Sequence, residues 1–253
     1  PVFDAAKASV ENSTVESGLR TAVFELPANI SPERAGLFRE QLNSERVVLV
    51  TGRQLMKTLT NQLVPNVGSS GSYVGYNYTR SPHISPAASY PGNLVRGVSS
   101  VDTKSNSDYL DKMAINGVEV LVSDQNAGGF RFSNGLTTSD HPVYRYASIV
   151  RLLDQVKSDL YINLQWVRSR PNNTLLQNDA ATACDAYLQT KFREGWFTKL
   201  DSTICSSINN TQRDQQAGRL NIRIRLTPTF PADRILVDTV LDLTEDFSLQ
   251  TAI

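Results

Sequence analysis

One long amphipathic helix constrains the fold more than any other feature of this sequence. Between Tyr146 and about Arg168, apolar residues recur at intervals of three and four, at Ile149, Leu152, Leu153, Val156, Leu160, Leu164 and Val167. This period places them along one face of an α-helix. The face must be covered, so we expect the helix to lie against a core over its whole length.

Three further helices are predicted from their end signals. They are expected at 31–42, 105–116 and 179–194. Ser31 can accept from the free amides of the first turn and Pro32 suits the first helical position. Gly117 and Gly195 follow the other two segments and suit a left-handed helix stop.

Two kinds of pattern predict strands. The continuous apolar run 46–50 is typical of a strand covered on both faces, and a further strand is predicted at 118–122. A short strand at 130–132 lies between two glycine turns. Near the end of the chain, apolar and polar residues alternate over 219–226 and again over 235–243.

The two alternating segments are predicted to pair in an antiparallel manner. In that arrangement Arg219, Arg223 and Arg225 would share one polar face opposite Asp238 and Asp242. Three like charges in a row repel each other, and the chain offers only two acidic partners here. At least one arginine is therefore predicted to meet an acidic neighbour, and these five residues form a candidate subunit interface.

The predicted fold class is α/β with α+β character. We expect a single mixed β-sheet flanked by the two long helices, with a C-terminal antiparallel strand pair. Residues 1–253 are interpreted as one domain in which 1–30 are peripheral. Residues 68–97, which are rich in glycine and proline, are interpreted as a wrapping loop or an insertion.

Composition argues against several function classes. The chain has 25 basic and 25 acidic residues, so it lacks the basic excess that is typical of nucleic-acid binders. It has no apolar run of about 18 residues that would predict membrane insertion. The two cysteines, Cys184 and Cys205, are expected to be reduced thiols in a core, and no metal site or cofactor is expected.

Catalytic motifs are weak in this sequence. The segment from Gly52 to Thr58 follows an apolar strand, but Met56 stands where a phosphate loop needs a glycine before Lys57. We therefore interpret it as a strand-to-helix turn. His83 and His141 are interpreted as turn residues, although a hydrolase or nucleotide-dependent enzyme with a site around either histidine is kept as an alternative.

A second alternative is a carbohydrate-binding module. Four tyrosines, Tyr73, Tyr76, Tyr78 and Tyr90, could form a stacking platform for a sugar or a single strand. Burial of these rings in a loop against a neighbouring subunit is the preferred interpretation.

Short motifs in collinear order resemble the core domain of contractile tail sheath proteins of bacteriophages, a group that includes R-type bacteriocin sheaths. The resemblance covers about 44–253. The residues that carry it as structural positions are Gly71, Gly75, Gly117, Gly135, Thr137, Arg151, Pro171, Asn172, Gly195, Gly218 and Pro231. The family's usual Arg before the threonine is replaced by Leu136, and only one Arg of its helix pair is present, at Arg151.

The resemblance implies a structural, non-enzymatic subunit. Such proteins polymerise as stacked rings around a tail tube, and their contraction drives the tube through the host envelope. The implied partners are other sheath subunits, the tube protein, the baseplate and the tail terminator, without nucleic acid. The implied location is the virion tail after assembly in the host cytoplasm, and terminal arms are expected to donate strands to neighbouring sheets. The start at Pro1 leads us to expect a fragment of a longer, large-phage protein.

Overall fold

The computed structural model describes residues 2–88, 94–103 and 106–232. The helices are α1 (Val2–Glu11), α2 (Pro32–Gln41), α3 (Ser70–Tyr78), α4 (Ser107–Ile115), α5 (Ala147–Asn163), α6 (Thr174–Arg193) and α7 (Gln212–Gln216). The strands are β1 (Ala22–Leu26), β2 (Val47–Thr51), β3 (Arg53–Lys57), β4 (Leu63–Gly68), β5 (Val98–Asp102), β6 (Val118–Asp124), β7 (Gly129–Phe132), β8 (Phe197–Ile204) and β9 (Arg223–Pro228). The α/β class with α+β character is confirmed.

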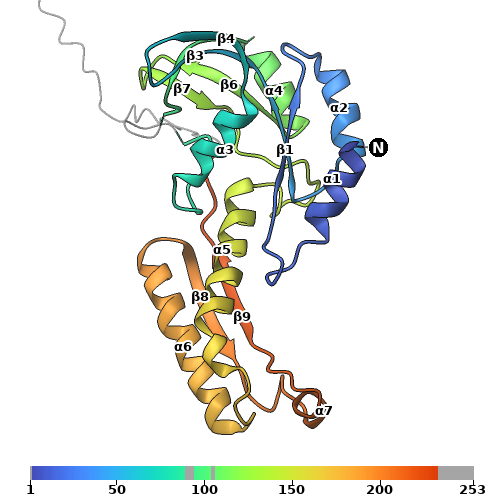
Figure 1. Ribbon diagram of the computed structural model, residues 1–253, viewed down its shortest axis with the longest axis vertical. Coiled ribbons are helices and arrows are strands. Elements are labelled where there is room, and N and C mark those ends of the chain that lie inside the picture. The colour runs from blue at the N-terminus through green and yellow to red at the C-terminus, as the bar shows by residue number, and fades with distance from the viewer. Residues whose placement is uncertain (1, 89–93, 104–105, 233–253) are drawn as a thin grey trace, which may run out of the picture.

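A mixed four-stranded sheet forms the centre of the upper part of the molecule, which we call the sheet lobe (elements α1 to β7; Figure 1). Its order is β1-β2-β6-β7, with β1, β2 and β6 parallel and β7 antiparallel to β6. Every residue of β2 is buried, as its unbroken apolar run predicts. One apolar cluster includes Met113 of α4 and another includes Tyr73 of α3, so both faces of the sheet carry a core.

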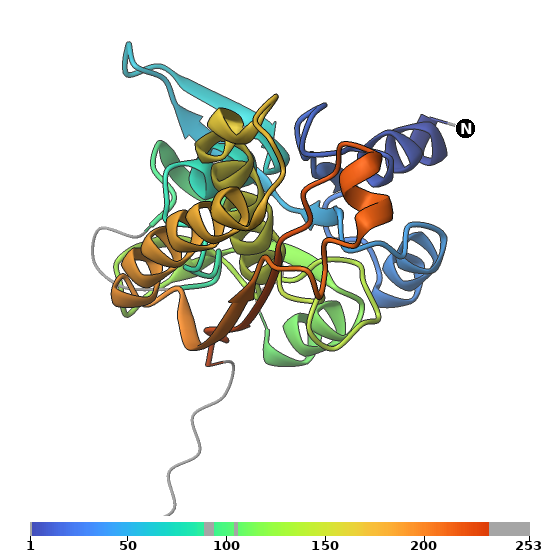
Figure 2. The same cartoon turned by 90° about the horizontal axis from the view of Figure 1, so that it is seen from below.

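A second, antiparallel sheet of order β4-β3-β5 belongs to the same lobe. In Figure 2 the β3–β4 hairpin projects away from the rest of the lobe. Gly52, in a left-handed conformation, joins β2 directly to β3. The interpretation of this segment as a strand-to-helix turn was therefore wrong.

The two long helices pack on a separate two-stranded sheet in the lower part of the molecule, which we call the strand-pair lobe (elements α5 to β9; Figure 1). Its core combines Leu152, Val156 and Leu160 of α5 with Cys184 and Leu188 of α6. Leu200, Ile224 and Leu226 pack against this cluster from the sheet. The described strands thus form three sheets, and the long helices cover the strand pair instead of a single mixed sheet.

A C-terminal antiparallel strand pair is confirmed among the described residues. β9 pairs antiparallel with β8, which the sequence patterns did not predict as a strand. β8 follows α6 directly after Gly195, whose left-handed conformation ends the helix and turns the chain back along it. The segment 235–243 lies outside the described residues.

The long helices also have different ends from those predicted. α5 stops at Asn163 and is followed by a 3-10 turn, Gln165–Val167, and Ile162 in its last turn is exposed. α6 begins at Thr174, earlier than predicted, because the Asn173 side chain accepts from the Leu176 amide as an N-cap.

Two segments that the sequence analysis interpreted as a peripheral region and a loop contain regular secondary structure. Residues 1–30 were interpreted as peripheral; of the described ones, β1 is an edge strand of the mixed sheet and Val10 of α1 is buried in its core. Residues 70–78 form α3, within the segment interpreted as a loop. The Glu25 carboxylate accepts from the amides of Ser69 and Ser70 at the start of α3, a contact that local composition does not predict.

Both thiols should resist modification in the folded protein. Cys184 and Cys205 are free and buried, as expected, and burial raises the pKa of Cys184 to about 11. Because the thiolate is the reactive form, we expect little reaction with a thiol reagent at pH 8 until denaturant is added. Absorbance with Ellman's reagent measures this, and rapid labelling of two thiols under native conditions would contradict it.

Candidate assembly surface

The outer face of β9 carries the charges that the alternating pattern predicts. Arg223 and Arg225 are exposed, while Ile224 and Leu226 between and beyond them pack against the helix layer. The opposite positions on β8 are Ile204 and Ser202. The strand therefore places two guanidinium groups side by side on the face away from α5 and α6.

No acidic side chain pairs with either arginine within the described part of the chain. The carboxylate of Asp201 on β8 pairs instead with Lys199 Nζ, at 2.6 Å. The predicted partners Asp238 and Asp242 lie outside the described residues. The two arginines therefore give this face of the described structure an excess of positive charge.

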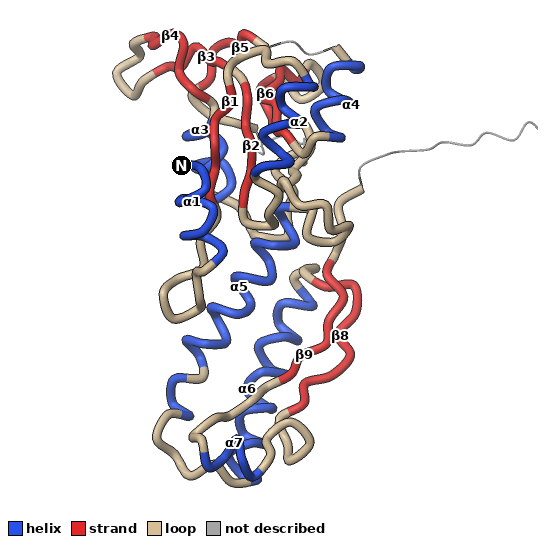
Figure 3. The backbone as a smooth tube through the Cα atoms, turned by 90° about the vertical axis from the view of Figure 1, so that its right-hand side faces the viewer, coloured by secondary structure: helices blue, strands red, loops and turns tan. Residues whose placement is uncertain are grey.

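Both edges of the strand pair lack a further strand among the described residues. β8 and β9 lie together on one side of α6 (Figure 3). Their outward backbone groups form a template to which another strand can add. The surface thus combines a basic face with two open edges.

Arg219 does not belong to the row of β9. It lies between α7 and the strand, where its amide donates to Asp214 O and its carbonyl accepts from Asn172 Nδ2, at 2.9 Å each. Asn172 also accepts from Gln177 Nε2 at 3.1 Å. The predicted turn residues Pro171 and Asn172 thus join the start of α6 to the segment after Gly218, which is in a left-handed conformation.

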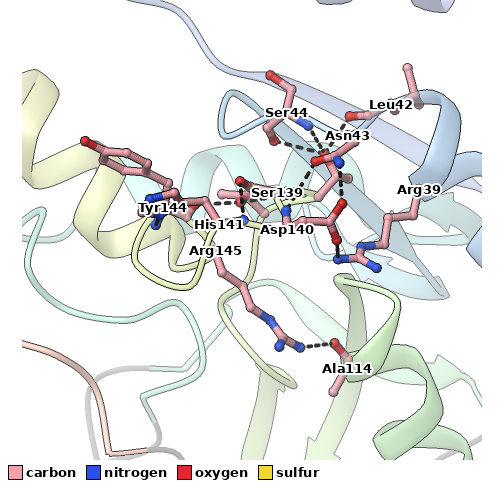
Figure 4. A network of polar contacts seen from close by, with 12 residues as sticks. Arg39, Leu42, Asn43, Ser44, Ala114, Ser139, Asp140, His141, Tyr144 and Arg145 are labelled. Carbon is pink, nitrogen blue, oxygen red and sulfur yellow. Dashed lines mark hydrogen bonds and ion pairs between the residues drawn. The ribbon is translucent and has the colours of Figure 1, made fainter.

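The loop before α5 is held by a polar network that Figure 4 shows from close by. The Asp140 carboxylate binds Arg39 and the Asn43 side chain, both at the end of α2. Arg145 Nη2 donates to Ala114 O, at 2.7 Å, near the end of α4. These contacts fix the position from which α5 leaves the sheet lobe.

The predicted residues Gly117, Gly135 and Thr137 lie in the same region. Thr137 is buried and its hydroxyl donates to Tyr144 O at 2.8 Å. Gly117 has φ +60°, and a Cβ there would lie 2.6 Å from Thr137 O. Gly135 has φ +72°, and a Cβ would lie 2.4 Å from Ser85 Oγ. At these positions the structure requires glycine.

Arg151 links α5 to α3. Its guanidinium donates to Asn77 O in the last turn of α3, at 2.5 Å, and to Arg80 O just after the helix, at 3.1 Å. Burial lowers the pKa of Arg151. Gly71 and Gly75 lie on α3 with no atom within 4 Å of a Cβ, so nothing in the structure explains a need for glycine there.

Two carboxylates, a half-buried one at Asp154 and a buried one at Glu119, were not singled out by the sequence patterns. Asp154 of α5 forms a bidentate salt bridge with Arg46, with N–O distances of 2.8 and 2.9 Å. Glu119 of β6 accepts from the amides of Leu136 at 2.5 Å and Asn134 at 3.2 Å. Burial raises the pKa of Glu119, and these amides oppose that shift. The sequence did contain signals for both carboxylates. Arg46, the partner of Asp154, directly precedes an apolar strand, and Glu119 lies within another strand.

The enzyme alternative gains no support from the positions of its residues. The segment 53–57 is a strand whose backbone pairs with β4 and β5, so it does not form a phosphate cradle. His141 Nδ1 accepts from the amides of Val143 and Tyr144, as expected of a turn residue. His83 packs its ring on Trp196, with centroids 5.9 Å apart, and burial lowers its pKa. The part of the chain that the structure describes holds no cluster of metal-binding side chains.

The tyrosine platform is not formed. Tyr73 and Tyr76 are buried in the core beside Phe132, and Tyr90 lies outside the described residues. Tyr78 is exposed at the end of α3. Pro231, the last of the predicted positions, lines a groove with His83 and Phe230. No helix in the described residues is long and apolar enough to span a membrane.

Comparison with known proteins agrees with this architecture. Residues 139–242 match the model of the phage tail sheath C-terminal domain, a range that includes α5, α6, β8, α7 and β9. A sequence search of curated proteins finds no match.

Solved structures with a similar fold come from contractile particles. The anti-feeding prophage baseplate contains a chain with TM-score 0.73 and 20% identity, and the match covers 96% of this chain and 64% of that one. A chain of the PVC sheath complex, from an extracellular contractile injection system in its contracted state, gives 0.75 and 18%, with 94% and 68% covered. The sheath tail protein from Listeria innocua gives 0.61 and 14%, with 89% and 53% covered.

The chain thus spans about two thirds of the length of the first two relatives. The shared fold and the matched domain agree with the resemblance carried by the collinear motifs. Residues 139–242 therefore match the phage tail sheath C-terminal domain, and the chain as a whole shares its fold with the solved chains of contractile particles.

Proposed function

We propose that the protein is a structural subunit of a contractile tail sheath that polymerises around a tail tube and contracts to drive the tube through a host envelope. The observation that carries this proposal is the β8–β9 surface, which lies within the matched sheath domain. Within the described residues this sheet has two open edges and a basic face without acidic partners, and such a surface is suited to repeated contact with other chains.

The open edges give the proposed subunit a means of attachment. A strand from the terminal arm of a neighbour would add to the edge of β8 or β9 through main-chain hydrogen bonds. Arg223 and Arg225 would then meet acidic side chains of that arm, of another subunit or of the tube. We further propose, by analogy with the family, that the assembled partners include the tube protein, the baseplate and the tail terminator, that the location is the phage tail, and that the whole chain is one sheath-type domain.

Charge reversal tests the basic face. We expect the pair Arg223→Glu and Arg225→Glu in the full-length protein to leave the melting temperature nearly unchanged, because exposed charges contribute little to folding. Assembly should fail or shift in its salt dependence, since the same repulsion recurs in every subunit. Negative-stain electron microscopy for tubes or stacked rings measures assembly.

The matched control changes the same charge elsewhere. Lys157 and Arg193 are exposed on the helix layer of the same lobe, so Lys157→Glu with Arg193→Glu should assemble normally. Assembly of the Arg223/Arg225 variant at every salt concentration would refute a role for this face. An unmodified full-length protein that forms neither tubes nor rings would refute the proposed function itself.

A further inference from the structure

The β3–β4 hairpin presents an apolar knob that its own lobe does not cover. Leu59 at the tip is fully exposed, and Leu63 and Val64 at the start of β4 are 56% and 42% exposed. Figure 2 shows the hairpin standing out from the lobe. Grouped exposed apolar side chains of this kind mark interaction sites.

The hairpin is poorly suited to accept an added strand. β4 pairs only with β3 among the described strands, and its middle contains Pro65, which has no amide to donate. Asn66 follows with φ 58°, a left-handed conformation that interrupts an extended edge. The knob must therefore be recognised through its side chains.

A matching apolar depression lies between α2 and α4. Leu37 and Ile115 are each 66% exposed, and they line a hollow of about 390 Å³ together with Pro32 and Gly36. Gly36 has no side chain to fill it, and a Cβ there would already lie 3.3 Å from Asn116 Oδ1. The Asn116 side chain donates to Pro32 O at 2.8 Å, which holds the two helices together beneath the hollow.

The charges around the two features are complementary. The hairpin from residue 53 to 68 contains no acidic residue. Its Lys57 is exposed, whereas its Arg53 is paired with Glu25. The depression is flanked by exposed Glu33 and Glu40. Its nearby Lys112 already pairs with Asp108, at 2.8 Å.

The β3–β4 hairpin and the helices α2 and α4, which line the depression, lie on opposite sides of the sheet lobe (Figure 3). A chain cannot fill its own depression, and two copies that joined through these features would leave one knob and one depression free. Such a head-to-tail contact continues from copy to copy and produces rings or helical filaments. We infer that the β3–β4 hairpin of one copy docks in the α2–α4 depression of the next copy. The inference rests on the proposed self-assembly and names one of its contacts.

Paired cysteine substitutions test this contact. A chain with both Leu59→Cys and Leu37→Cys should give a ladder of dimers, trimers and larger products on mild oxidation of the full-length protein, resolved on a non-reducing gel. A mixture of the two single variants should stop mainly at dimers, because each chain then has one reactive position. The native cysteines are buried, so they add little background.

The matched control moves one cysteine to the other lobe. Ile208 is exposed there, so a chain with Leu59→Cys and Ile208→Cys has two accessible thiols that this contact does not bring together. We expect at least tenfold less trimer from it than from the Leu59/Leu37 pair. Equal ladders from the two chains, or no ladder from either, would overturn the inference.

Charge exchange gives an independent measurement. Lys57→Glu in the Leu59→Cys, Leu37→Cys chain should reduce the ladder several-fold, and adding Glu33→Lys with Glu40→Lys should restore it. An unaltered ladder in the Lys57→Glu chain would overturn the charge complementarity. If the unmodified protein forms tubes but the Leu59/Leu37 pair gives no ladder, only this contact is wrong, whereas absence of tubes speaks against the proposed function.

Discussion

Replacing Asp154 with alanine should lower the free energy of unfolding by roughly 3–5 kcal/mol, the cost of leaving a buried guanidinium without its partner. Arg46 is buried beside β2 and binds Asp154 with both terminal nitrogens, and it also donates to Arg20 O at 3.2 Å. The hydrogen bond to Asp154 raises the pKa of Arg46. Without that partner the guanidinium still stays charged, because arginine is not deprotonated in proteins near neutral pH. Urea unfolding followed by tryptophan fluorescence measures the loss.

Two variants show whether the effect comes from the unpaired charge. Asp185→Ala, at an exposed position of α6, should change the unfolding free energy by no more than about 0.5 kcal/mol. Arg46→Met combined with Asp154→Leu should recover most of the loss, because apolar replacement of both partners removes the stranded charge. A loss below about 1 kcal/mol for Asp154→Ala would contradict the view that Asp154 joins α5 to the mixed sheet by pairing with the buried guanidinium of Arg46.

Gly117→Ala should be the second strongly destabilising change, costing roughly 3 kcal/mol or more. A left-handed non-glycine residue alone costs about 1–2 kcal/mol. In addition, the new Cβ would lie 2.6 Å from Thr137 O, a backbone atom that cannot move without displacing the loop before α5. The Thr137 amide donates to Arg145 O and that of Thr138 to Val47 O, so the displacement would break ladder-like contacts on both sides.

Gly128→Ala is the matched control for this prediction. Gly128 also has a left-handed conformation, with φ +70°, but no atom lies within 4 Å of a Cβ there. Its cost should stay near the conformational value of about 1–2 kcal/mol. The difference between the two losses of unfolding free energy measures the effect of the contact with Thr137. Equal losses would show that the loop before α5 moves to accommodate the new Cβ without a loss of stability.

The residues that carry the sheath resemblance have different physical roles in the structure. Gly117, Gly135 and Gly195 occupy left-handed positions, and Thr137 and Asn172 bind backbone groups of distant segments. These residues hold the loops and turns that connect α5 and α6 to the rest of the structure. The arginines of β9 serve no such purpose in the described residues, which is why we assign them to contacts between chains.

Local patterns determined the character of individual segments. The three-and-four spacing of α5, the unbroken apolar run of β2 and the alternation of β9 each state which side chains of that segment are buried, and the structure confirms all three. Helix ends at Ser31, Gly117 and Gly195 were also predicted, because capping depends on neighbouring backbone groups.

Only the tertiary structure decided which segments meet. The alternating pattern of β9 is compatible with pairing to any strand that has an apolar face. The pattern therefore did not identify β8 as the partner. The start of α3 depends on Glu25, and the attachment of α5 depends on Arg46, both far away in the sequence. A periodic pattern records how one segment divides its side chains between core and solvent. The partner is chosen by contacts between distant residues, and their energies appear only when the chain has folded.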